Sequence, residues 1–262
     1  MAANEDPDAL RVVLLGASNI VRGFSTIIDV LEHFHGPKLN VMAATGHGRS
    51  YGNNSRVLFR TLPGIIPSEL WNAIEKQPQQ KTIALVTDIG NDLLYDAKVE
   101  AIANWVEVCL KKMKKISSQI IVTSLPVCNL EKLSSRRFVF FRSCLFPKSK
   151  LTFSDAKQRA HDLNQEVERL ANNYDCNFKI LSENWYGIDP IHIAADQKLN
   201  AWNQILANHV EKENPVFLDK NKSFQPLRYR LAIPHERQLF GFSQTRTQPY
   251  IKLASGTCVS LY

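Results

Sequence analysis

Of the 262 residues, 44% are hydrophobic, which is enough for one large core that needs no disulfide or metal ion to hold it together. No apolar run approaches the ~20 residues of a membrane span. The acidic, polar residues 1–10 contain no apolar signal segment, and we expect them to be disordered. The five cysteines are scattered and form no CxxC pair, which predicts reduced thiols in a cytoplasmic protein and no metal site built from them.

The net charge of +7 is concentrated in two segments of the chain. Residues 111–150 carry ten Lys and Arg against one acid, and residues 221–262 carry six against one. Basic segments can bind nucleic acids or membrane surfaces, but lysines also favour the C-terminal end of a helix because of its dipole. No nucleic-acid-binding motif accompanies these charges, so we expect a solvated basic face and no nucleic-acid partner.

The first predicted unit is a strand, a tight turn and a helix. The four apolar residues 12–15 predict a strand buried on both faces, and apolar residues then recur at helical spacing from Ile20 to Leu31. The small residues Gly16 and Ala17 allow a tight turn between the two elements. Ser18 lies where the helix begins. Its hydroxyl either caps the helix or acts as a nucleophile beside backbone N–H groups at the positive end of the helix dipole.

The remainder of the chain alternates between predicted strands and helices. We expect strands at 38–44, 82–86, 118–124 and 177–181, and helices at 54–61, 67–74, 99–113, 154–174 (with Ser154 as its cap) and 195–210. Residues 125–150 are predicted to be a long irregular connection, typical of a lid or binding loop.

This alternation predicts a three-layer α/β/α fold. Five strands separated by helices indicate a flavodoxin-like parallel sheet that is covered on both faces. The character changes after Pro215, where short strands are expected at 238–242, 250–253 and 257–261. We therefore predict a main domain at 11–215 and a small β-rich C-terminal appendage at 216–262.

Polar segments follow three of the predicted strands. Residues 46–52 hold three glycines, residues 87–92 contain Gly90-Asn91-Asp92, and residues 185–192 end in Asp189-Pro190-Ile191-His192. In open α/β sheets, ligands bind at the carboxyl ends of the strands. Each segment by itself is equally typical of an ordinary turn.

Together with Gly16-Ala17-Ser18, these segments resemble the four sequence blocks of the SGNH hydrolases, also called GDSL esterases and lipases. The resemblance covers about residues 11–210. Gly48 fits the glycine of the second block best, because Arg49-Ser50 follows it, and Gly46 is the alternative. The chain departs from the family at Ala17, where relatives commonly carry an aspartate. This departure removes a carboxylate that would pin the turn of the nucleophile.

The resemblance implies a role for each block. Ser18 is the expected nucleophile, His192 its base and Asp189 the carboxylate that orients the imidazole. The expected oxyanion donors are the N–H groups of Ser18 and Gly48 and the side-chain amide of Asn91, which donates without titrating. Neither a metal ion nor a cofactor is expected.

The sequence therefore predicts hydrolysis of an ester or acetyl group through an acyl-enzyme on Ser18. The substrate is expected to be a small-molecule ester or an acylated carbohydrate or lipid. An acyltransferase with the same residues and a non-catalytic binding protein on the same fold are the alternatives.

Four other side chains are candidates for substrate contact. His47 lies in the glycine loop, and Arg49 either binds an acidic substrate group or is simply solvated. Trp185 and Tyr186 either line an acyl pocket or pack together in the core.

Overall fold

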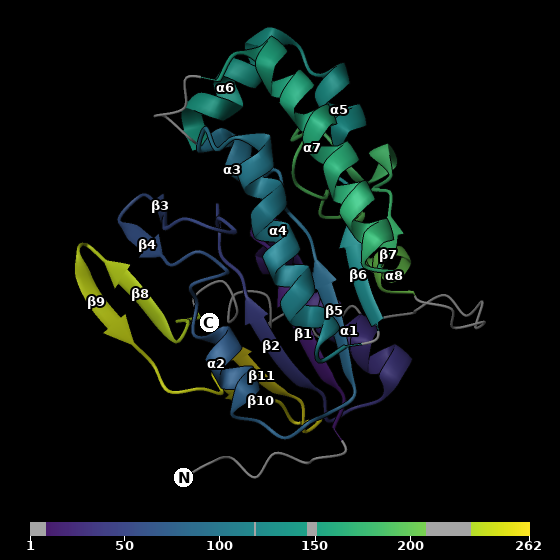
Figure 1. Ribbon diagram of the computed structural model, residues 1–262, viewed down its shortest axis with the longest axis vertical. Helices are drawn as coiled ribbons and strands as arrows, with labels where there is room; N and C mark the ends of the chain where they lie inside the picture. The colour runs from purple at the N-terminus through teal and green to yellow at the C-terminus, as the bar shows by residue number, and fades with distance from the viewer. Residues whose placement is uncertain (1–8, 118, 146–150, 208–231) are drawn as a thin grey trace.

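The computed structural model describes residues 9–117, 119–145, 151–207 and 232–262. The N-terminal residues 1–8, expected to be disordered, and residues 208–231 of the predicted appendage and its approach lie outside the described residues. The described chain forms a mostly parallel central sheet between two layers of helices, with a small antiparallel sheet at one side (Figure 1). The predicted α/β/α architecture is thus confirmed.

The central sheet has seven strands in the order β10-β11-β2-β1-β5-β6-β7. All neighbours are parallel except β10 and β11. The five strands predicted for the main domain have the flavodoxin-like order, in which the chain reverses direction across the sheet between β1 and β5. The strands are β1 (Arg11–Leu15), β2 (Asn40–Ala44), β5 (Thr82–Val86), β6 (Gln119–Thr123), β7 (Asn177–Lys179), β10 (Ile251–Lys252) and β11 (Cys258–Leu261).

The predicted strand count of five was wrong, because the C-terminal strands extend the main sheet. β11 pairs in parallel with β2, and Val259 opposite Val41 is fully buried. Without β11, the outer edge of β2 would present a row of unpaired backbone groups, which sheets rarely leave uncovered.

The helices cover the two faces of the sheet in separate groups. Residues alternate along β1, so Val13 and Leu15 pack on the face covered by α2, α4 and α7, whereas Val12 and Leu14 pack on the face covered by α1 and α8. The predicted burial of this strand on both faces is confirmed. The helices are α1 (Ser18–His35), α2 (Leu70–Glu75), α3 (Asn91–Leu94), α4 (Val99–Lys114), α5 (Val127–Lys132), α6 (Ser135–Leu145), α7 (Phe153–Asn173), α8 (Lys198–Leu206) and the 3-10 helix η1 (Glu183–Trp185).

Three local predictions were wrong. The helix expected at 54–61 is a β-hairpin, because Leu58 adopts a positive φ and turns the chain after only three strand residues. The predicted irregular connection at 125–150 contains α5 and α6, and Phe138 of α6 packs into the core. The cap of α7 is Thr152, whose hydroxyl accepts from the Asp155 N–H, and not Ser154.

The small sheet joins this hairpin to a second one from the C-terminal part of the chain. Its order is β3-β4-β8-β9, and all its pairs are antiparallel. The strand expected at 238–242 is interrupted by the turn Phe240-Gly241, which separates β8 from β9. The strands are β3 (Ser55–Val57), β4 (Arg60–Leu62), β8 (Glu236–Leu239) and β9 (Phe242–Thr245).

The attachment of the C-terminal strands can be tested at Thr257. Its hydroxyl donates to Glu32 of α1 at 2.6 Å and accepts from the Leu39 N–H at 3.1 Å, in a fully buried position. Thr257→Val should lower the free energy of unfolding by about 1–3 kcal/mol, because it leaves buried polar groups without their partner. Urea denaturation measures this loss. Ser255→Ala, which removes a less buried donor to the same carboxylate, should cost less.

Candidate active site

The first site element is the turn between β1 and α1. A Cβ added to Gly16 would lie 2.8 Å from Ile20 and 2.9 Å from Thr87, so the close approach of β5 requires glycine at this position. Ser18 is the first residue of α1 and is nearly buried. The cap position of α1 is held by Ala17, whose side chain cannot accept a hydrogen bond from the first backbone N–H groups of the helix. Ser18 is therefore not the side-chain cap of this helix, and its hydroxyl has another partner.

That partner is a histidine from the far end of the chain. Ser18 Oγ lies 2.8 Å from His192 Nε2, and His192 Nδ1 lies 2.6 Å from Asp189 Oδ2. The three side chains thus form one hydrogen-bonded chain that joins residues 174 positions apart. These are the distances at which a base takes a proton from a hydroxyl and a carboxylate orients the base.

The turn around Asp189 is fixed by its own backbone. Asp189 Oδ1 accepts from the N–H groups of Ile191 at 3.2 Å and His192 at 3.3 Å. Arg22 of α1 approaches Oδ2 at 3.4 Å on the partly exposed side. Burial alone would raise the pKa of Asp189, but the hydrogen bond from His192, its charge, the Ile191 N–H and Arg22 together lower it. The carboxylate consequently stays ionised beside the imidazole.

The three expected oxyanion donors have no hydrogen-bond acceptor in the described part of the chain. The side-chain nitrogen of Asn91 is buried and has no hydrogen-bond partner in the described part of the chain. The backbone N–H groups of Ser18 and Gly48 likewise have no protein acceptor among the residues described. Buried donors are normally paired, so the unpaired amide of Asn91 is compatible with a ligand-binding position.

The structure also bears on the choice between the two glycines. Gly48 has a φ of 64°, which favours glycine, and its carbonyl accepts from the Tyr95 hydroxyl at 2.6 Å. A Cβ on Gly46 would lie 2.3 Å from Leu62 of β4, so Gly46 faces the hairpin. The choice of Gly48 as the donor stays a prediction.

Two residues that the sequence did not single out hold this arrangement together. Asp88, directly after β5, has Oδ2 within 2.9 Å of the Ala17 N–H and 3.0 Å of the Asn19 N–H. Asp88 Oδ1 accepts from the side chain of Asn19 at 2.7 Å. This carboxylate, from the segment after β5, thus holds the turn at Ala17, which has no polar side chain of its own. It also places a negative charge at the start of α1, where the helix dipole stabilises it.

Asn19 connects the serine turn to the histidine loop. Its side-chain nitrogen donates to the Ile191 carbonyl at 2.9 Å, and its side-chain oxygen accepts from the Ile193 N–H at 2.9 Å. The two bonds flank His192 on both sides in sequence. Because the partners lie more than 170 residues away, no local sequence pattern could have identified this role.

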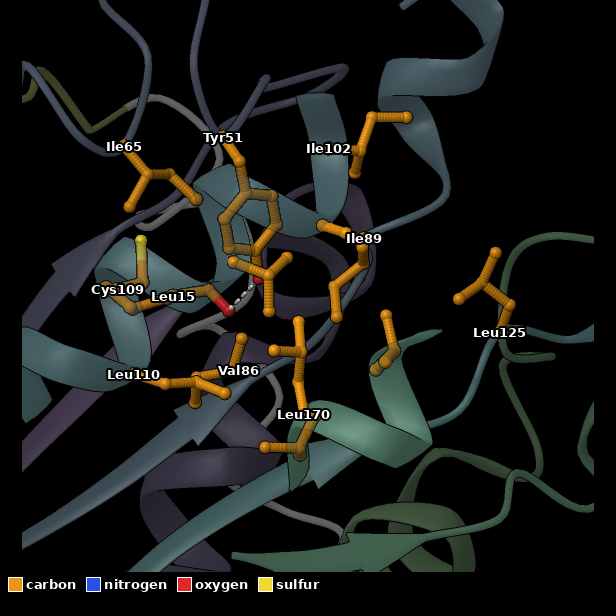
Figure 2. Close-up of a cluster of buried hydrophobic side chains, with 14 of the residues drawn as sticks. Leu15, Tyr51, Ile65, Val86, Ile89, Ile102, Cys109, Leu110, Leu125 and Leu170 are labelled. Carbon is orange, nitrogen blue, oxygen red and sulfur yellow. Dashed lines mark hydrogen bonds between the residues drawn. The ribbon is translucent and has the colours of Figure 1, made fainter. Parts of the chain in front are cut away.

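The glycine loop is anchored by a buried tyrosine that points into the core (Figure 2). The hydroxyl of Tyr51 donates to the Thr87 carbonyl at 2.7 Å and approaches the Leu15 carbonyl at 3.3 Å, so it ties the loop to the ends of β1 and β5. Its N–H donates to Asp92 at 2.9 Å. Burial raises the pKa of Asp92 to about 6, and this hydrogen bond offsets the effect only in part. Tyr51 therefore fixes the glycine loop relative to α3 and to the ends of β1 and β5.

The four further candidates fall in different environments. Arg49 is fully buried and donates to the carbonyls of Pro63, Thr45 and Tyr262, so both the substrate-contact and the solvated predictions for it were wrong. Burial, with the nearby Arg60, lowers the pKa of Arg49 to about 9. Arg49 therefore fixes the conformation of the glycine loop through its buried hydrogen bonds to backbone carbonyls.

Trp185 and Tyr186 are not equivalent. Trp185 is buried in the core on the α1–α8 face, as the core-packing alternative predicted, and is not among the described residues that line the cavity beside the site. Tyr186 lines the cavity beside the site, and its buried hydroxyl has no partner among the described residues. His47 offers its carbonyl to Arg60 and is not among the residues that line this cavity, so its contact with substrate stays a prediction.

The cavity is apolar and has a volume of about 980 Å³, counted with its opening to solvent. Asn19, Asp88 and Asn91 form its polar end, and residues of α3, α5, α6 and α7 line it together with the segment that follows β6. Ser18 and His192 are not among the lining residues, whereas their sequence neighbours Asn19 and Ile191 are. Among the described residues, no group of three His, Cys, Asp or Glu could hold a metal ion, and no helix is long and apolar enough to cross a membrane.

Comparison with known proteins gives matches in structure but not in sequence. No protein-family model and no curated protein matches the chain. Solved structures that resemble it, each over 74% of this chain, are SGNH/GDSL esterases and lipases. They include the psychrotrophic esterase EstA from Pseudoalteromonas sp. (8% identity, 93% of that chain, TM-score 0.47). The carbohydrate acetylesterase Est24 from Sinorhizobium meliloti (13%, 95%, 0.48) and a GDSL-like lipase from Bacteroides thetaiotaomicron (14%, 84%, 0.47) are others. At this degree of similarity, function has to be argued from the side chains of this chain.

The positioning role of Asp88 can be tested by Asp88→Asn. Asparagine tolerates the positive φ of this residue, 59°, but its amide nitrogen would face the side-chain nitrogen of Asn19. The hydrogen bond between the two side chains is therefore lost, while the bonds from the Ala17 and Asn19 N–H groups can remain. We expect stability to fall by about 1–3 kcal/mol and kcat/KM of the folded protein to fall by about tenfold or more. Asp175→Asn is the matched control, because Asp175 also has a positive φ but is exposed and pairs with Lys114 of α4. Equal losses in both variants would contradict the role assigned to Asp88.

Proposed function

We propose that the protein is a serine hydrolase that cleaves carboxylic esters through an acyl-enzyme on Ser18. The observation that carries the proposal is the hydrogen-bonded chain from Ser18 through His192 to Asp189. Asn91, whose amide has no partner among the described residues, lines the same cavity as Asn19, the neighbour of Ser18 in sequence. A non-catalytic binding protein would not require a serine hydroxyl 2.8 Å from an imidazole whose other nitrogen is bonded to a carboxylate. The solved structures that resemble the chain include esterases and lipases, which agrees with this reaction class.

The proposed reaction has two half-reactions. Ser18 Oγ attacks the ester carbonyl while His192 Nε2 takes the hydroxyl proton, and the negative charge on the carbonyl oxygen is stabilised by the N–H groups of Ser18 and Gly48 and the amide of Asn91. His192 then returns the proton to the leaving alcohol. Water attacks the acyl-enzyme with His192 again as base, which releases the acid and restores Ser18. Asp189 holds the imidazole and stabilises its charged form throughout.

The cavity favours an apolar acyl group over an acetylated carbohydrate. Its walls are almost entirely apolar, and its polar end includes Asn91, the proposed donor to the carbonyl oxygen. An ester whose carbonyl is bound by Asn91 can therefore extend its acyl chain between α5, α6 and α7. An acyltransferase would form the same acyl-enzyme and pass the group to an alcohol, so products measured with and without added alcohols distinguish the two.

The role of Ser18 is tested by substitution and by a covalent probe. Ser18→Ala should lower ester hydrolysis by at least about 10³-fold, because the remaining donors supply only part of the rate, while stability changes little. A serine-directed phosphonate should add to Ser18 in the wild type, as read by intact mass and peptide mapping. His192→Ala should suppress the adduct, and His47→Ala should largely preserve it. A Ser18→Ala variant that keeps its activity would rule out the mechanism.

The acyl-chain role of the cavity is tested at Ala160, a buried residue of α7 that lines it. With one alcohol kept constant, kcat/KM should rise about fourfold for each added methylene until the cavity is full, since burying a CH₂ contributes ~0.8 kcal/mol. Ala160→Phe should reduce hydrolysis of octanoyl esters while largely preserving that of acetyl esters. Gln165→Phe, on the exposed side of the same helix, should change neither. A wild type that prefers acetyl esters, with Ala160→Phe unchanged, would contradict this role and leave the Ser18 mechanism in place.

A further inference from the structure

The small antiparallel sheet carries an exposed apolar cluster that the proposed reaction does not use. Four large hydrophobic side chains lie at the turns of its two hairpins: Leu58 is 83% exposed, Phe59 58%, Phe240 65% and Phe242 75%. They make up half of the large hydrophobic residues that are exposed in the described part of the chain. We call these four residues the tip patch.

The two hairpin turns form a single surface. The rings of Phe59 and Phe240 stack with centroids 4.7 Å apart, and the Phe240 N–H donates to the Phe59 carbonyl at 2.8 Å. Both hairpins stand beside the central sheet, at the left of Figure 1, away from the helices around the cavity. The tip patch is therefore a local protrusion built from two segments about 180 residues apart.

The backbone conformation at both turns indicates that these side chains do not stabilise the fold. Leu58 has a φ of 54° and Phe240 a φ of 52°, a region that is sterically unfavourable for bulky residues. Asparagine or glycine is the usual residue at such positions, and Phe240-Gly241 replaces the Asn-Gly that favours this type of turn. Strained residues that gain no burial in return are typical of functional sites.

The apolar area of the tip patch and the charge around it indicate the kind of partner that it binds. Fully buried aromatic side chains cover ~150–250 Å² each, so the tip patch offers roughly 400–700 Å², which is less than the ~800 Å² per side of a stable protein interface. The strands that carry it hold three arginines, Arg56, Arg60 and Arg237, and Arg246 follows β9, against the single acid Glu236. Arg56 and Arg246 are exposed. Apolar side chains flanked by arginines fit the interface of an anionic membrane.

We propose that the tip patch docks the protein onto the surface of an anionic phospholipid membrane. The four side chains enter the boundary between headgroups and acyl chains, and the exposed Arg56 and its neighbours contact lipid phosphates. The interaction places the hydrolase at a lipid surface but does not itself require turnover, so it stands independently of the proposed reaction.

The test is sedimentation of the full chain with phospholipid vesicles, carried out with the Ser18→Ala variant so that no lipid is consumed. Vesicles of phosphatidylcholine with phosphatidylglycerol should bind the protein, and vesicles of phosphatidylcholine alone should bind it more weakly. Arg56→Gln should weaken binding to the anionic vesicles by up to about fivefold. Added salt should reduce that binding.

The decisive variant is Leu58→Asn combined with Phe240→Asn. It should weaken vesicle binding by at least about tenfold and raise the melting temperature, because asparagine tolerates both backbone positions. Phe242→Ser, which leaves both turns intact, is the second variant and should also weaken binding. Ile180→Asn, an equally exposed apolar residue outside the tip patch, should leave it unchanged.

Three results would overturn the proposal. The first is a Ser18→Ala protein that does not bind anionic vesicles, and the second is tip-patch variants, made in that background, that bind them equally well. The third is a concentration-dependent dimer in analytical ultracentrifugation that the double variant abolishes, because the occupant would then be a second copy of the chain. Loss of esterase activity in the wild type would bear only on the proposed reaction.

Discussion

The geometry of the site depends on the carboxylate of Asp88. It accepts from the N–H groups of Ala17 and Asn19 and leaves the N–H of Ser18, between them, without a protein acceptor among the described residues. One side chain therefore satisfies the start of α1, fixes the turn that presents the serine hydroxyl and keeps a donor available. Through Asn19 the same carboxylate is linked to the loop that carries His192. Ala17 offers no side chain that could hold this turn, and the support comes instead from the end of β5.

The sequence was informative wherever a local pattern determined the structure. The bounds of β5 were predicted to the residue, and those of β1 to within one, because both strands are short, fully buried apolar runs. The order of four polar segments at strand ends also indicated Ser18, Asn91, Asp189 and His192, which the fold brings to one edge of the sheet. Their catalytic roles stay predictions, whereas their proximity is a property of the structure.

The sequence was less informative where the structure depends on distant partners. The role of Asp88 depends on N–H groups about 70 residues earlier, and β11 is part of the main sheet because β2 offers it an open edge. The hairpin at 55–62 was taken for a helix because its turn places leucine at a positive φ, where no sequence rule expects it. Arg49 was misjudged because a charged residue is rarely fully buried. In each case a tertiary interaction outweighed a local preference.

The most direct test of the central claim is a crystal structure of the phosphonate adduct. The proposed mechanism predicts a covalent bond from Ser18 Oγ to phosphorus and a phosphoryl oxygen about 2.7–3.1 Å from the Ser18 N–H, the Gly48 N–H and the Asn91 amide. It also predicts that the alkyl group of the probe extends into the cavity between α5, α6 and α7. An adduct on another residue, or a phosphoryl oxygen that points away from all three donors, would contradict it.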